Sequence, residues 1–82
     1  MINDIKFKIK EFILEERSLR DLDINDETPL ISSGIIDSIT TLSLIDFIEK
    51  SFNIEFEPYE VDQENLNTIN RITDFILEKQ SH

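Results

Sequence analysis

Apolar residues recur at separations of three and four in several segments, and this spacing constrains the fold more than any other feature of the chain. It places the apolar side chains on one face of a helix. We predict helices from about residue 2 to Glu16, from Ser38 to Ser51 and from Ile69 onward, with a shorter one between Val61 and Leu66. The alternation in 54–57 is typical of a strand, but a proline follows it and no second strand is available for pairing. The pattern therefore predicts an all-α fold, a four-helix bundle with a long first loop and a short third helix.

Capping residues stand where these helices are expected to begin and end. Asn3 or Asp4 is a plausible cap for the first helix, and Thr68 for the last. Ser38 is read as the N-cap of the second helix, because Ile39 and the apolar residues after it follow at helical spacing. Asn53 is expected to end that helix, since asparagine tolerates the left-handed conformation.

A long connection separates the first two predicted helices and needs anchors of its own. Thr28-Pro29 favours a turn there, because proline fixes its own backbone and biases the residue before it away from helix. The apolar residues expected to hold the loop on the bundle are Leu22, Ile24, Leu30 and Ile31.

Size and charge limit what the chain can do. Its 82 residues are expected to form a single domain, 1–82, with little core to spare and no deep enzyme cleft. A formal net charge of -10 repels nucleic acid and attracts basic protein surfaces, although acidity of this kind also simply keeps a small protein in solution. No signal peptide or membrane span is visible, so we expect a cytoplasmic protein with no membrane partner.

The residues needed for catalysis or metal binding are missing or badly placed. There is no cysteine, so any thiol chemistry must come from a cofactor, and the only histidine, His82, is at the chain end. The acidic run that begins at Asp21 and Asp23 resembles a calcium loop. It fails the full pattern, because Asp26 replaces the required glycine and Ser32 the bidentate glutamate. We therefore expect no metal site and no enzyme.

The segment Gly34-Ile35-Ile36-Asp37-Ser38-Ile39 is the strongest candidate for a functional site. The only glycine of the chain precedes a serine at the expected start of a helix. The first-turn amides and the helix dipole favour a negatively charged group there, so a phosphate ester on Ser38 is well placed. The alternative is that Ser38 only caps the helix.

These residues resemble the attachment site of the acyl and peptidyl carrier proteins, in which Asp-Ser-Leu or Asp-Ser-Ile opens the second helix. Three further segments match the family at similar separations: Thr28-Pro29-Leu30-Ile31, Phe52-Asn53-Ile54-Glu55-Phe56 and Asn67-Thr68-Ile69-Asn70-Arg71-Ile72. The resemblance implies that Ser38 carries covalent 4'-phosphopantetheine, whose thiol bears a cargo as a thioester, and that Asp37 helps to present the site.

The same resemblance implies a set of partner enzymes. A phosphopantetheinyl transferase uses coenzyme A and magnesium to modify the serine, a ligase or acyltransferase loads the cargo, and downstream biosynthetic enzymes receive it. The helix after the serine is the main docking surface in such carriers, so we expect Ile39, Thr41 and Leu42 to contact partners, unless both apolar residues complete the core. The initiating Met1 and the four-helix length favour a freestanding protein, expected to be a monomer.

Two positions depart from the fatty acid carriers. Those proteins usually have acidic residues two and five positions after the modified serine, where this chain has Thr40 and Ser43. The hydroxyls favour an aminoacyl cargo over fatty acid synthesis, although polyketide carriers vary at the same sites. The competing class is an unmodified acidic helical module that binds a partner through Ile39 and Leu42.

Overall fold

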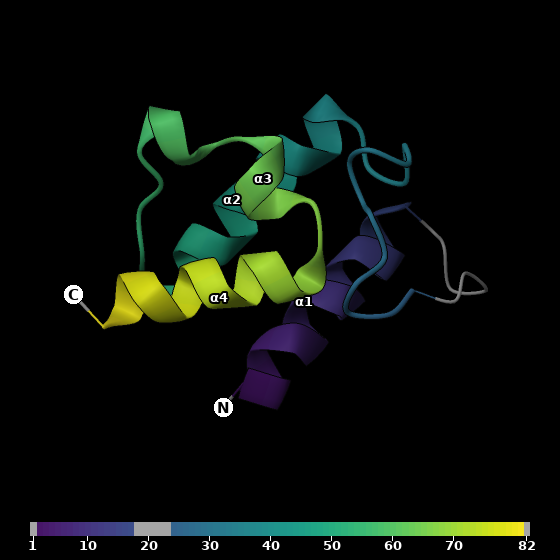
Figure 1. The fold of residues 1–82 in the computed structure, drawn as a ribbon. Coiled ribbons are helices and arrows are strands. Elements are labelled where there is room, and N and C mark those ends of the chain that lie inside the picture. The colour runs from purple at the N-terminus through teal and green to yellow at the C-terminus, as the bar shows by residue number, and fades with distance from the viewer. Residues whose placement is uncertain (1, 18–23, 82) are drawn as a thin grey trace.

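The computed structural model describes residues 2–17 and 24–81, and this part of the chain contains four α-helices and one short 3-10 helix (Figure 1). No strand occurs within those ranges, so the all-α prediction is confirmed. The elements, in chain order, are α1 (Ile2–Arg17), α2 (Ser38–Phe52), η1 (Pro58–Glu60), α3 (Gln63–Leu66) and α4 (Ile69–Gln80).

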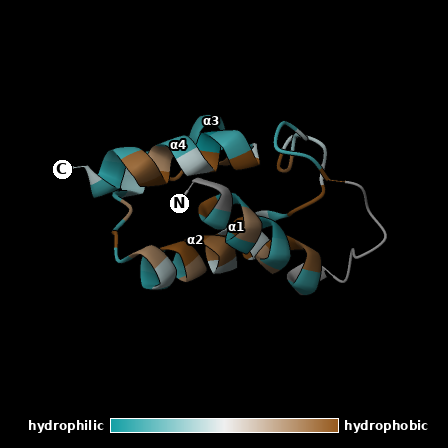
Figure 2. Ribbon diagram, turned by 90° about the horizontal axis from the view of Figure 1, so that it is seen from below, coloured by the Kyte–Doolittle hydropathy of each residue, from teal (hydrophilic) through white to brown (hydrophobic). Residues whose placement is uncertain are grey.

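One apolar core joins these helices. Helix α1 packs against α2 and α4, and α3 packs against α4. The hydropathy colouring shows apolar stretches along α1, α2 and α4 (Figure 2), and burial of such side chains is the main favourable term in folding. The buried apolar residues are Ile5, Ile9, Ile13, Ile24, Leu30, Ile36, Leu44, Ile45, Ile48, Leu66, Ile69, Ile72 and Ile76.

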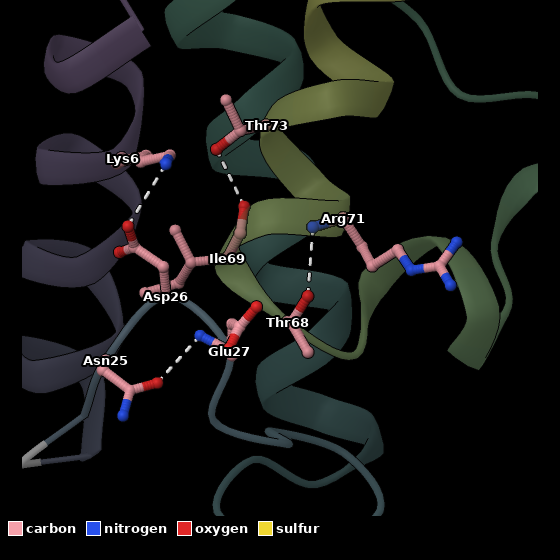
Figure 3. A network of polar contacts seen from close by, with 8 residues as sticks. All are labelled: Lys6, Asn25, Asp26, Glu27, Thr68, Ile69, Arg71 and Thr73. Atoms are coloured by element: carbon pink, nitrogen blue, oxygen red, sulfur yellow. Dashed lines mark hydrogen bonds and ion pairs between the residues drawn. The ribbon is translucent and has the colours of Figure 1, made fainter.

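The end of the first loop is held by both apolar and polar contacts. Ile24 and Leu30 are fully buried, as predicted, whereas Leu22 lies outside the described residues. Asp26 bridges two helices: its carboxylate accepts the Lys6 ammonium of α1 at 3.2 Å, and its carbonyl accepts the Asn70 amide of α4 at 3.0 Å. The carboxylate half of this bridge is visible in Figure 3.

Most predicted helix ends agree with the structure. The Thr68 hydroxyl accepts the Arg71 amide at 3.0 Å and caps α4 (Figure 3). Asn53 ends α2 with a left-handed backbone, φ 56° and ψ 50°. The cap expected at Asn3 or Asp4 is wrong, because the helix already begins at Ile2, where the apolar spacing also begins.

The third helix is shorter than predicted. It begins at Gln63 rather than Val61, because Asp62 has an extended backbone and its carboxylate accepts the Asn65 amide at 2.9 Å. The segment before it is the predicted anchored loop: the Phe56 ring stacks on Phe75 with centroids 4.7 Å apart. Within the described residues, none of the helices combines the length and the apolar character needed to cross a membrane.

Candidate functional site at the start of helix α2

The chain turns sharply just before α2, and Gly34 makes this turn possible. Its φ of +82° lies in the left-handed region, where a side chain is strained. The turn is closed on both sides: the Gly34 amide donates to the Ile31 carbonyl at 3.1 Å, and the Ile36 amide donates to the Leu30 carbonyl at 3.0 Å. Ile36 is buried and fixes the point from which the chain enters α2.

Asn67, between α3 and α4, holds this turn from the other side. Its side-chain oxygen accepts the amides of Ile31 at 2.9 Å and Ser32 at 3.0 Å, and its carbonyl accepts the Leu30 amide at 2.6 Å. Its side-chain amide also donates to the Ser32 hydroxyl at 3.2 Å. Asn67 lies in a segment that carries the family resemblance, but the sequence does not predict this role, since spacing does not show that a residue 36 positions away clamps the turn.

Asp37, not Ser38, is the N-cap of α2. It has an extended backbone, and its carboxylate accepts the Thr40 amide at 2.8 Å. Ser38 is already the first helical residue, so the predicted serine cap is wrong. Aspartate caps as well as serine does, and here it comes one residue earlier. The Asp37 carbonyl also accepts the Thr41 amide at 2.9 Å and the Thr41 hydroxyl at 2.7 Å.

Because Asp37 caps the helix, the Ser38 hydroxyl is available for chemistry. Ser38 is exposed, and its hydroxyl makes no hydrogen bond to the described part of the chain. The first-turn amides of Ser38 and Ile39 likewise find no acceptor among the described residues. Two amides at the positive end of a helix suit a phosphate ester, so the residues present fit a phosphate-linked prosthetic group.

The residues expected to contact partners are distributed unevenly around the helix. Ile39 is 76% exposed and Leu42 is 63% exposed, so the alternative that they complete the core is wrong. Thr41 is half-buried and its hydroxyl is engaged by Asp37. Thr40 is 5% exposed and faces the core, so its hydroxyl, which was used to favour an aminoacyl cargo, is not part of the surface. Ser43 is half-buried.

A shallow groove of about 530 Å³ runs beside Ser38, between the start of α2 and the segment before α3. Its walls are mainly apolar and include Ile31, Leu42 and Val61. An open groove of this kind suits a flexible arm or a partner's side chain better than a reaction that must exclude water.

The charged pair with shifted pKa values lies away from this serine, on the side of α3. The Lys79 ammonium approaches the Glu60 carboxylate to 2.7 Å. Its hydrogen bond, aided by one from the Glu57 amide, holds the pKa of Glu60 below its ordinary value. The same contact raises the pKa of Lys79. The pair joins the end of α4 to η1 and stabilises the fold rather than the serine.

No metal centre is found within residues 2–17 and 24–81, where no three acidic or histidine side chains gather closely enough to hold an ion. Asp21 and Asp23, which suggested the rejected calcium loop, lie outside those ranges.

Comparison with known proteins identifies a family and several similar proteins. Residues 8–76, which include the turn, Asp37 and Ser38, match the family described as phosphopantetheine attachment site. The D-alanyl carrier protein of Lactococcus lactis subsp. lactis (strain IL1403) is 38% identical over 60 residues, covering 73% of this chain and 71% of that protein. Its counterpart from Lactococcus lactis subsp. cremoris (strain MG1363) is 39% identical over 59 residues, covering 72% and 70%.

The match covers most of the chain and agrees with the helical fold and with an exposed serine at the start of α2. These two relatives are, by name, carriers of an amino acid, and they fit an aminoacyl carrier better than a carrier of fatty acid synthesis. The chain belongs to the phosphopantetheine attachment family and is a carrier protein of the acyl and peptidyl type, whose cofactor is covalent 4'-phosphopantetheine.

Proposed function

We propose that Ser38 is the residue that carries 4'-phosphopantetheine and that residues 1–82 form one carrier domain. The observation that carries this proposal is the exposed Ser38 hydroxyl at the first position of α2, relieved of capping by Asp37. In the attachment step the Ser38 oxygen bonds to the phosphorus of the pantetheine phosphate in coenzyme A. The bond from that phosphorus to adenosine 3',5'-bisphosphate breaks, and the hydroxyl proton passes to a base of the transferase.

The cargo proposed for this chain is an amino acid, and D-alanine is the first candidate because the relatives are named D-alanyl carriers. When attached, the arm supplies the thiol that bears the cargo as a thioester. The chain itself catalyses no step in this account. It positions the arm, presents a surface to each enzyme and raises the effective concentration of the cargo there.

Partners dock, in this proposal, on the surface around the serine formed by Asp37, Ile39, Thr41 and Leu42. Ile39 and Leu42 support it most directly, since large apolar side chains exposed next to a reactive group are typical of contact sites. Asp37 and Thr41 contribute by holding the first turn in place. The first partners are a phosphopantetheinyl transferase and an ATP-dependent ligase. The cytoplasmic location and the monomeric state stay predictions from the sequence.

Intact mass spectrometry tests the proposal in two stages. The purified protein and Ser38→Ala are incubated with coenzyme A, magnesium and a promiscuous transferase. We expect the wild type alone to gain one phosphopantetheine. The modified protein is then offered D-alanine, L-alanine or malonyl groups with their activating enzymes, and D-alanine should load best.

Docking is tested with variants that keep the fold. Leu42→Asp and Ile39→Asp should slow both modification and loading by about fivefold or more, the size expected when a contact residue is lost from a small interface. Their melting temperatures should change little, because both side chains are exposed. Normal rates in both variants would place docking elsewhere. A wild-type protein that accepts no arm would favour the unmodified interaction module.

A further inference from the structure

A second exposed apolar surface lies away from Ser38, between the outer sides of α1 and α2. The Phe12 ring of α1 stacks on the Phe47 ring of α2, with centroids 4.6 Å apart and planes inclined by 18°. Phe7, one and a half turns before Phe12 on α1, is 64% exposed. The three aromatic residues line one depression of about 500 Å³, which we call the aromatic face. Figure 2 shows the two helices that form it next to each other.

The aromatic face is continuous with the surface around Ser38. A neighbouring depression is lined by Phe12, Phe47 and Leu42 together with four polar residues, Ser43, Asp46, Lys50 and Ser51. Leu42 also borders the groove beside Ser38. A track of connected depressions, apolar at both ends and mixed in the middle, therefore runs from the start of α2 to Phe7. Neighbouring exposed apolar side chains, unlike a single one, are typical of an interaction site.

The charges along the track indicate a basic partner. Three acidic residues line it, Glu11, Glu15 and Asp46, against two lysines. Lys50 and Asp46 pair with each other at 3.1 Å and offset one another. Glu11 and Glu15 then stand against Lys8, whose ammonium lies 5.7 Å from the centre of the Phe52 ring, so the track keeps an acidic excess. With a net charge of -10 for the whole chain, the complementary surface is an apolar segment flanked by lysine or arginine.

Distance along α2 separates the transferase from enzymes that act on the thiol of the arm, of which the loading ligase is the first. The transferase acts on the Ser38 hydroxyl itself and must therefore sit over the first turn of α2. A ligase acts on the thiol at the far end of the arm, so its body can rest well away from the serine. The far end of the 15-residue helix α2 is about 20 Å from its start. The aromatic face, formed near that far end, suits the enzyme that acts on the thiol.

We propose that the aromatic face is a docking surface for the ATP-dependent ligase that loads the cargo, which covers it with an apolar segment flanked by basic side chains. This inference rests on the proposed function. It extends the docking surface from Leu42 to a second helix, α1, which contributes none of the site residues predicted from the sequence. It also distinguishes loading from modification, because loading then depends on Phe7 in addition to the residues around Ser38 that both reactions use.

The test compares Phe7→Ser with Tyr59→Ser as a matched control. Both aromatic side chains are largely exposed, 64% for Phe7 and 79% for Tyr59, but Tyr59 lies in η1, away from the track. Phe12 and Phe47 pack against the core and are left unchanged. Each protein is first modified by a promiscuous transferase and then charged with D-alanine by a D-alanine-activating ligase and ATP, with kcat and KM for the carrier measured separately.

We expect Phe7→Ser to raise the KM for loading about fivefold or more, with kcat, melting temperature and the rate of phosphopantetheine transfer unchanged. Tyr59→Ser should match the wild type throughout. Glu11→Gln should raise the KM at low salt, and the difference should vanish at high salt.

A Phe7→Ser carrier that loads with a wild-type KM would overturn the inference and leave the proposed function intact. So would a dimer in solution that dissociates in Phe7→Ser, since a second copy would then cover the face. A wild-type protein that gains the arm but is not charged by this ligase would overturn both D-alanine as the cargo and the ligase as the partner on the aromatic face. Failure to gain the arm would overturn the proposed function itself.

Discussion

Replacement of Asn67 by alanine should destabilise the protein more than any exposed substitution near the serine. The side chain accepts two backbone amides of the turn before α2, at 2.9 and 3.0 Å, and donates one further hydrogen bond, to Ser32. Each such bond contributes about 1 kcal/mol net, and a half-buried amide left without an acceptor costs more than that. The Ser32 amide is exposed and can bind water instead. The expected loss is therefore about 2 kcal/mol.

Urea unfolding followed by circular dichroism measures this loss directly. A change of about 2 kcal/mol in a domain of this size should lower the melting temperature by about 8 to 16 °C. Asn67→Asp is the matched control, since a carboxylate keeps the acceptor and loses only the bond to Ser32. It should retain most of the stability. An Asn67→Ala protein that melts within about 2 °C of the wild type would refute the view that this side chain holds the turn.

Three further predictions concern the same region and the charged pair. Asp37→Ala should lower the free energy of unfolding by about 1 kcal/mol, because it removes the cap of α2. Ser38→Ala should change it by less than about 0.5 kcal/mol. Equal losses in the two variants would show that the serine is the cap. Gly34→Ala should cost about 1 to 2 kcal/mol through its positive φ alone, because no atom stands within 4 Å of the added carbon, and an unchanged urea midpoint would contradict this. Because the hydrogen bond from Lys79 lowers the pKa of Glu60 in the fold, this contact stabilises the protein at neutral pH and is lost as the pH falls through that lowered pKa. The free energy of unfolding of Glu60→Gln should therefore fall less than that of the wild type as the pH is lowered from 7 to 3. Equal falls in the two proteins would contradict the stabilising role of the Glu60–Lys79 contact.

The helices could be predicted because their signals are local. Apolar spacing located α1, α2 and α4, and Thr68 and Asn53 marked helix ends through their own side-chain chemistry. The errors arose where neighbouring residues compete for one role. Asp37 and Ser38 are both good caps, and only the backbone angles decide between them. Asp62 competed in the same way with the apolar start expected at Val61.

Tertiary features were harder to predict. Ser38 was identified, and Ile39 and Leu42 were placed next to it, but periodicity alone left their exposure open. The same periodicity did not show that Thr40 faces the core, although the argument for an aminoacyl cargo relied on its hydroxyl. The support for an aminoacyl cargo now comes from the D-alanyl carrier relatives rather than from Thr40. The Asn67 clamp and the stacked pair of Phe12 and Phe47 join segments far apart in sequence, and no local pattern indicates either of them.

The most direct test of the central claim is peptide mapping of the protein after incubation with coenzyme A, magnesium and a transferase. The account predicts a single phosphopantetheine on the peptide that contains Ser38, and none on Ser38→Ala. The nearby serines Ser32, Ser33 and Ser43 should stay unmodified in both proteins. An unmodified wild type, or the same mass gain on a different serine, would contradict the account.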